Sequence, residues 1–70
     1  MLEVTVTFDP SANRASQVVK LNRPAAVHLD PRDAIAARNI AAGLRANAWV
    51  SDGLKVYRVV GNHARLVKER

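Results

Sequence analysis

The first eight residues alternate between apolar and polar side chains, and this alternation constrains the fold more than any other feature. The apolar positions are Leu2, Val4, Val6 and Phe8. A period of two with β-branched residues predicts a strand that buries one face and exposes the other. The chain must therefore supply further strands to pair with this one, and an element to cover its apolar face.

A helix start lies in the middle of the chain. Asp30 is suited to the N-cap, Pro31 to the first helical position, and Asp33 places negative charge in the first turn. We expect the helix to run from Pro31 to about Asn47, or to end one turn earlier if Gly43 is its C-cap. At about 100° per residue, one apolar stripe would face the sheet. That stripe is Ala34, Ala37, Ile40, Ala41, Leu44 and Ala48.

The remaining strands are predicted from apolar runs bounded by turn residues. Residues 16–21 form a candidate strand and residues 25–29 a weaker one. Residues 54–60 and 63–68 flank Gly61-Asn62, a pair suited to a type II′ hairpin turn. The sequence therefore predicts one α+β domain over residues 1–70, with a single helix packed on a small antiparallel sheet that ends in a C-terminal hairpin.

Composition limits the core and the compartment. In 70 residues, 49% are hydrophobic, but many of these are Ala and Val, so the core should be thin. A homodimer would add buried area, with residues 2–8 and 63–68 as candidate edge strands. The chain has no Cys and no apolar run of the ~20 residues that span a bilayer, so we expect a cytoplasmic protein without a membrane partner.

Catalytic patterns are not apparent in the sequence. His28 and His63 are 35 positions apart, the hydroxyl residues lie outside any nucleophile-elbow sequence, and the three glycines are isolated. Two distant histidines without cysteine are also poor material for a metal site. We therefore expect a non-enzymatic protein with no catalytic residue, no metal and no cofactor.

Positive charge is concentrated at the C-terminus. The formal net charge is +5, and residues 53–70 hold five cations and one acid. With a regular two-residue loop, Arg58 would oppose Arg65 and Lys55 would oppose Lys68. An anionic partner would relieve this repulsion, although long side chains can also splay apart in water. We expect this hairpin to contact nucleic acid or a nucleoprotein through Lys55, Arg58, His63, Arg65, Lys68 and Arg70.

The outer face of the helix offers a second hypothesis. Apolar residues bordered by arginines without acidic partners are typical of a protein-binding surface, although an Ala-rich helix can also use arginine simply for solubility. In this alternative the chain is an inhibitor or adaptor that binds an acidic protein surface. The residues of this face are Ile35, Arg38, Asn39, Ala42 and Arg45.

Residues 59–66, Val-Val-Gly-Asn-His-Ala-Arg-Leu, resemble one central hairpin of the carbon-storage-regulator family, whose dimers bind RNA. Helix-inserted variants of that family also place a helix before this hairpin. The family continues into a further strand with its main RNA-contact arginine, and these 70 residues hold no counterpart, so no binding residue carries over. In size and architecture the chain is also similar to small phage proteins that block host machines, among them anti-CRISPR proteins.

Overall fold

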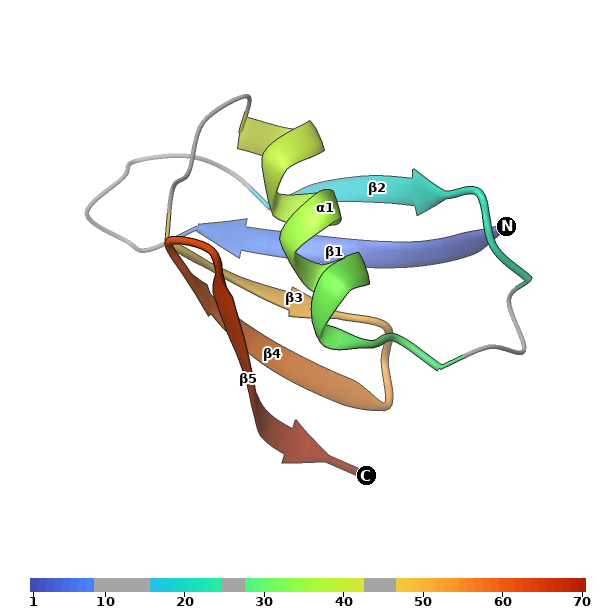
Figure 1. The fold of residues 1–70 in the computed structure, drawn as a ribbon. Coiled ribbons are helices and arrows are strands. Elements are labelled where there is room, and N and C mark those ends of the chain that lie inside the picture. Colours follow the sequence, from blue (N-terminus) through green and yellow to red (C-terminus); the bar gives the residue numbers. More distant parts are fainter. Residues whose placement is uncertain (9–15, 25–27, 43–46) are drawn as a thin grey trace.

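A computed structural model describes residues 1–8, 16–24, 28–42 and 47–70 of the chain. They form one helix and a five-stranded antiparallel sheet of order β2-β1-β3-β4-β5, with the helix lying across one face (Figure 1). The predicted α+β fold with a C-terminal hairpin is confirmed. The elements are β1 (Leu2–Phe8), β2 (Gln17–Leu21), α1 (Pro31–Ala42), β3 (Ala48–Ser51), β4 (Lys55–Val60) and β5 (His63–Glu69).

Strand β1 lies inside the sheet. It pairs with β2 on one side and with β3 on the other, so the expectation that it forms an edge is wrong. The edges are β2 and β5, and α1 contacts both of them as well as the three strands between. The second predicted strand is confirmed as β2. Residues 25–27 of the weaker candidate lie outside the described residues, and His28 and Leu29 are not in a strand.

The helix begins as predicted. Asp30 caps it: its carboxylate accepts from the backbone N–H of Asp33 at 2.8 Å, and its carbonyl accepts from Ala34 N–H at 3.0 Å. The Arg23 guanidinium bridges Asp30 and Asp33. The Asp33 N–H bond, and secondarily Arg23, hold the pKa of Asp30 below its ordinary value.

The predicted phase of α1 is partly wrong. Ala34 and Ala37 are fully buried as expected, but so is Arg38, whereas Ile40 is 62% exposed. Ile35 and Ala41 pack against the core from its margin. The buried stripe is therefore rotated toward Arg38. Leu44 and Gly43 lie outside the described residues, and Ala48 belongs to β3 rather than to the helix.

The core lies between α1 and the sheet. Alternate residues of β1, β2, β3 and β4 supply most of it, together with Leu29 from the segment before the helix. Its buried hydrophobic members are Leu2, Val4, Val6, Phe8, Val19, Leu21, Leu29, Ala34, Ala37, Ala48, Val50, Tyr57 and Val59. Valine and alanine predominate, so the core is as thin as composition predicts.

Candidate functional site

The sheet presents a second face, opposite α1, which we call the open face. The exposed positions of β1 lie on it, and the strand registers extend it across the whole sheet. Among the described residues, α1 packs only on the other face. The strand residues of the open face are Glu3, Thr5, Thr7, Val18, Lys20, Trp49, Ser51, Val56, Arg58, Val60, His63, Arg65 and Lys68.

An irregularity in the β4–β5 ladder decides which cations reach the open face. The register follows the prediction from Val60↔His63 to Tyr57↔Leu66, with Gly61 at φ 58° in the turn. It then shifts, so that Val67 is an extra residue and Val56 opposes Lys68. The shift places Lys68 on the open face. In a regular ladder Lys68 would lie on the helix side instead.

The same shift corrects the second predicted pair of like charges. Lys55 opposes Glu69 rather than Lys68, and both lie on the helix side of the sheet. Lys55 is therefore separated from the other cations of the predicted site. The cations gathered on the open face of the hairpin are Arg58, Arg65 and Lys68, and Arg70 follows at the end of β5.

Arg58 and Arg65 do oppose each other, as predicted. Strand β3 lies on the other side of β4, and its Trp49 is the register partner of Arg58. The guanidinium of Arg58 lies over the Trp49 ring, 3.9 Å from the ring centroid. This cation–π contact draws the charge of Arg58 toward β3 and away from Arg65, which relieves the repulsion between them.

The aromatic residues divide between the two faces. Tyr57, the aromatic residue of the basic hairpin, is only 6% exposed and packs in the core with Phe8. Trp49 lies on the open face instead. From the sequence, Tyr57 in the hairpin and Trp49 just before it predict only a weak base-stacking platform. The contact of Trp49 with Arg58 depends on the pairing of β3 with β4, which the sequence does not reveal.

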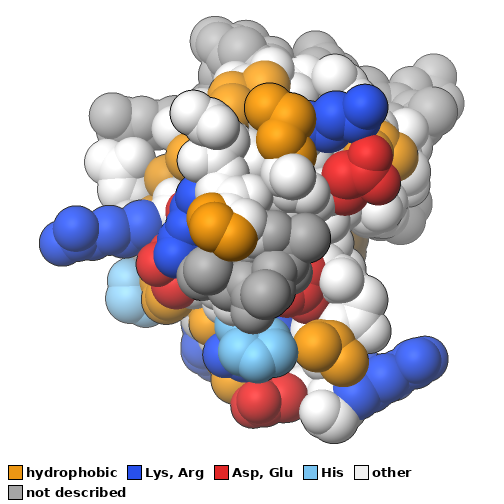
Figure 2. Space-filling view, turned by 90° about the vertical axis from the view of Figure 1, so that its right-hand side faces the viewer, with side chains coloured by type: hydrophobic (Ala, Val, Ile, Leu, Met, Phe, Trp, Pro, Cys, Tyr) orange, Lys and Arg blue, Asp and Glu red, His pale blue; other side chains and the backbone are white. Residues whose placement is uncertain are grey.

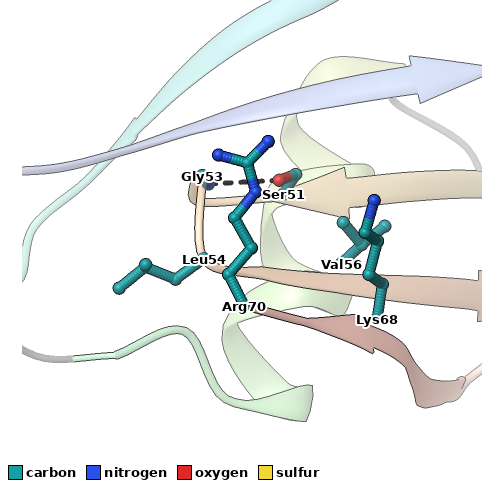
Figure 3. Close-up of a pocket in the computed structure, with 6 residues that line it drawn as sticks. All are labelled: Ser51, Gly53, Leu54, Val56, Lys68 and Arg70. Atoms are coloured by element: carbon teal, nitrogen blue, oxygen red, sulfur yellow. Dashed lines mark hydrogen bonds between the residues drawn. The ribbon is translucent and has the colours of Figure 1, made fainter.

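A hollow of about 280 Å³ lies at the end of the open face where β5 ends. Figure 3 shows the side chains of Lys68 and Arg70 extending to the same side of β5, beside the β3–β4 turn. The Arg70 N–H donates to the carbonyl of Leu54 at 2.8 Å, which fixes its backbone. The described residues that line it include two cations and no acidic side chain: Ser51, Gly53, Leu54, Val56, Lys68 and Arg70.

Asp52 holds the β3–β4 turn that forms one wall of this hollow. Its carboxylate accepts from the N–H groups of Leu54 at 2.9 Å, Lys55 at 2.8 Å and Leu29 at 3.2 Å. Partial burial acts to raise the pKa of Asp52, but these backbone donors outweigh it and lower the pKa below its ordinary value. Gly53 follows with φ 95°, a conformation that favours glycine.

Two cations elsewhere among the described residues form ion pairs. On the open face, Lys20 of β2 pairs with Glu3 of β1 at 3.8 Å. Near the helix start, Arg23 pairs with Asp30 and Asp33. Figure 2 shows acidic, basic and hydrophobic side chains interspersed on one end of the molecule. Among the described residues, a group of cations thus shares the β4–β5 part of the open face: Arg58, Arg65 and Lys68.

The helix face proposed as the alternative site is not formed as expected. Arg38 is buried, and its Nε donates to Asn39 Oδ1 at 2.9 Å. Ile35 lies against the core margin, and only Asn39 is exposed as predicted. Arg45 and the side chain of Ala42 are not among the described parts of the chain.

Within the described ranges, no three His, Asp or Glu side chains come together as potential metal ligands. His28 and His63 are both exposed, and only His63 lies on the open face. In the same ranges, α1 is too short and too polar to cross a membrane.

Comparisons with known proteins gave no match to a family model, to a curated protein or to a solved structure. The resemblance of the β4–β5 hairpin to the carbon-storage-regulator family gains no support from them. Any function must therefore be inferred from the geometry of the open face.

Proposed function

We propose that this chain is a non-enzymatic binding protein that contacts nucleic acid, free or within a nucleoprotein, through the open face. The observation that carries the proposal is the irregularity at Val67, which brings Lys68 and Arg70 to the side of the hairpin that already holds Arg58 and Arg65. Cations displayed on a rigid sheet bind phosphates and release counterions, which drives association with nucleic acid.

The alternative, a protein-binding inhibitor or adaptor that acts through the helix, has weaker support. Two of its five residues, Ile35 and Arg38, pack against or inside the core. Of the two arginines that the hypothesis placed at the border of this face, Arg38 is buried and Arg45 lies outside the described residues.

The salt dependence of binding tests the proposal. If four phosphates are neutralised, log K should fall against log[salt] with a slope of about −3 to −4. Replacing Arg58 and Arg65 by Gln should reduce the slope by about half. The matched control replaces Arg32 and Lys55 by Gln, because this removes the same charge from the helix side.

The control should retain most of the slope. If both double variants weaken binding equally, net charge rather than the open face is responsible. If neither duplex DNA nor RNA is bound at ~50 mM salt, at concentrations above the usual non-specific range of about 1–100 μM, the proposal is wrong.

A further inference from the structure

The width of the open face limits the kind of nucleic acid that fits it. The cations lie on the face of a five-stranded sheet rather than on a projecting two-stranded ribbon. Strands about 4.8 Å apart give such a sheet a width of roughly 20 Å. The major groove of duplex DNA is about 12 Å wide, so the open face cannot enter it to read base edges. A duplex that lies flat against this face presents its phosphates to it.

The Trp49–Arg58 stack offers a flat π surface in the middle of the face. Both residues are partly exposed, and the Arg58 guanidinium carbon lies 3.9 Å from the centroid of the Trp49 ring. Unpaired bases stack on aromatic rings and on guanidinium planes, whereas paired bases inside a duplex present only their edges. This stack is therefore suited to a base from a single strand.

The cationic hollow lies directly beside that stack. Ser51 is two residues from Trp49 on β3, and Val56 is two residues from Arg58 on β4, a separation of about 7 Å along each strand. Lys68 and Arg70 reach into the hollow from β5 (Figure 3). The Ser51 hydroxyl oxygen accepts from Gly53 N–H at 3.1 Å, which leaves its own hydrogen available for an anion.

These features fit a phosphate group. Arg70 can donate two parallel hydrogen bonds to phosphate oxygens, and Lys68 supplies a point charge. A base on the Trp49–Arg58 stack and the neighbouring phosphodiester in the hollow would occupy adjacent positions along the same strands.

We propose that the ligand of the open face is single-stranded nucleic acid, with a base stacked on Trp49 and Arg58 and the adjoining phosphodiester held by Lys68, Arg70 and Ser51. This inference rests on the proposed function and narrows it to one class of substrate. DNA and RNA strands share the chemistry that these residues recognise, and the experiment compares them.

Trp49 is the only tryptophan in the chain, so its fluorescence reports on this site alone. The probes are DNA and RNA oligonucleotides of about 10 nucleotides, within the usual site sizes. Each is compared with its duplex and with an abasic strand of the same length. We expect single strands to change the Trp49 emission and to bind at least about tenfold more tightly than the abasic strand.

Two variants test the two halves of the site. Trp49→Leu should weaken single-strand binding about tenfold and abasic-strand binding much less, because it removes the aromatic ring but keeps the cations of the open face. Arg70→Gln should weaken binding of both strands and reduce the salt slope by about one. Trp49→Phe, which keeps a ring, should restore most of the affinity if the loss reflects stacking rather than misfolding.

The outcomes separate this inference from the proposed function. Duplex and single strand bound equally, with Trp49 emission unchanged, would overturn the single-strand inference and leave nucleic-acid binding in place. An abasic strand bound as tightly as the normal strand would also overturn it. Absence of binding to every probe at low salt would remove both proposals.

Discussion

Arg38 and Ile40 show that the burial of a helix residue can be the opposite of what its side-chain polarity predicts. Arg38 is fully buried, and Ile40, two residues later, is 62% exposed. Ile35 and Ile40 lie about 140° apart on a helix, so only one of them can face the sheet. The other residues of the buried stripe are alanines, so the stripe has little hydrophobic contrast with the rest of the helix. The sequence pattern therefore does not decide whether Ile35 or Ile40 faces the sheet. The long aliphatic stem of arginine lets Arg38 occupy a buried position on the same helix as these alanines.

The first prediction concerns these two residues. Arg38→Ala should lower the free energy of unfolding by about 2 kcal/mol or more, because it removes a fully buried side chain and leaves a cavity. Ile40→Ala should change it by less than about 0.5 kcal/mol, because the side chain is largely exposed. Urea denaturation of both variants measures the difference. Equal losses would show that the phase of α1 described here is wrong.

Asp52 carries the second prediction. Asp52→Asn should lower the free energy of unfolding by about 1–2 kcal/mol at pH 7, since an amide offers one acceptor where the carboxylate offers two. The folded state holds the pKa of Asp52 below its ordinary value of about 3.9. Its contribution is therefore complete above that value and is lost as pH falls through the lowered, folded pKa.

The stabilities of wild type and Asp52→Asn should accordingly converge below about pH 4. Thermal melts from pH 7 to pH 2 would show this. Two curves that remain parallel over the whole range would mean that the charge of Asp52 contributes nothing to the fold.

At the scale of elements, the turn residues of a hairpin predict the strand pairing correctly only close to the turn. Gly61-Asn62 correctly places four residue pairs, from Val60↔His63 to Tyr57↔Leu66. Farther from the turn, Val67 is an extra residue without a partner in the ladder. Lys55 therefore lies opposite Glu69 rather than Lys68. An opposite-charge pair replaces a like-charge pair, which is a physical reason for the irregularity. No local pattern marks it, because Val67 continues an ordinary β-branched strand.

The third prediction follows from this arrangement. Deleting Val67 should leave a regular ladder with Lys68 still opposite Val56, so the loss of stability should stay within about 1 kcal/mol and the salt slope of nucleic-acid binding should persist. Deleting Ala64, which has a regular partner in Val59, should turn Arg65 toward the helix side and destabilise the hairpin. Denaturation and cross-strand NMR contacts check the pair. Equal damage from both deletions would contradict the described register.

At the scale of the whole molecule, local patterns predicted β1, β2, α1 and the two hairpin strands, but neither β3 nor the order of the strands. β1 and the two hairpin strands follow from alternation and turn residues. β3 has only four residues and separates β1 from β4, which are remote in sequence. That non-local insertion brings Trp49 beside Arg58 and Ser51 beside Val56. The charge of the site was therefore visible in the sequence, while its stacking surface and its hollow depended on strand order.

The last prediction concerns assembly. Both edges of the described sheet are open, and a thin core favours further burial. Two copies joined through β5 would bring Arg65 and Lys68 of each copy together, which charge repulsion opposes. Edge β2 presents instead Val18, which is 60% exposed, and Lys20, which is already paired with Glu3. We therefore expect a homodimer that pairs through β2.

Sedimentation at ~100 μM should give the mass of a dimer. Val18→Lys should shift the chain toward monomer, because charge on an edge strand opposes pairing. Val60→Lys is the matched control: Val60 is 49% exposed but lies on β4, away from the β2 edge. Circular dichroism of both variants verifies that the fold is kept. A wild-type chain of monomer mass would refute the dimer, and a dimer that survives Val18→Lys but not Val60→Lys would move the contact to the basic end of the sheet, where it would compete with nucleic acid.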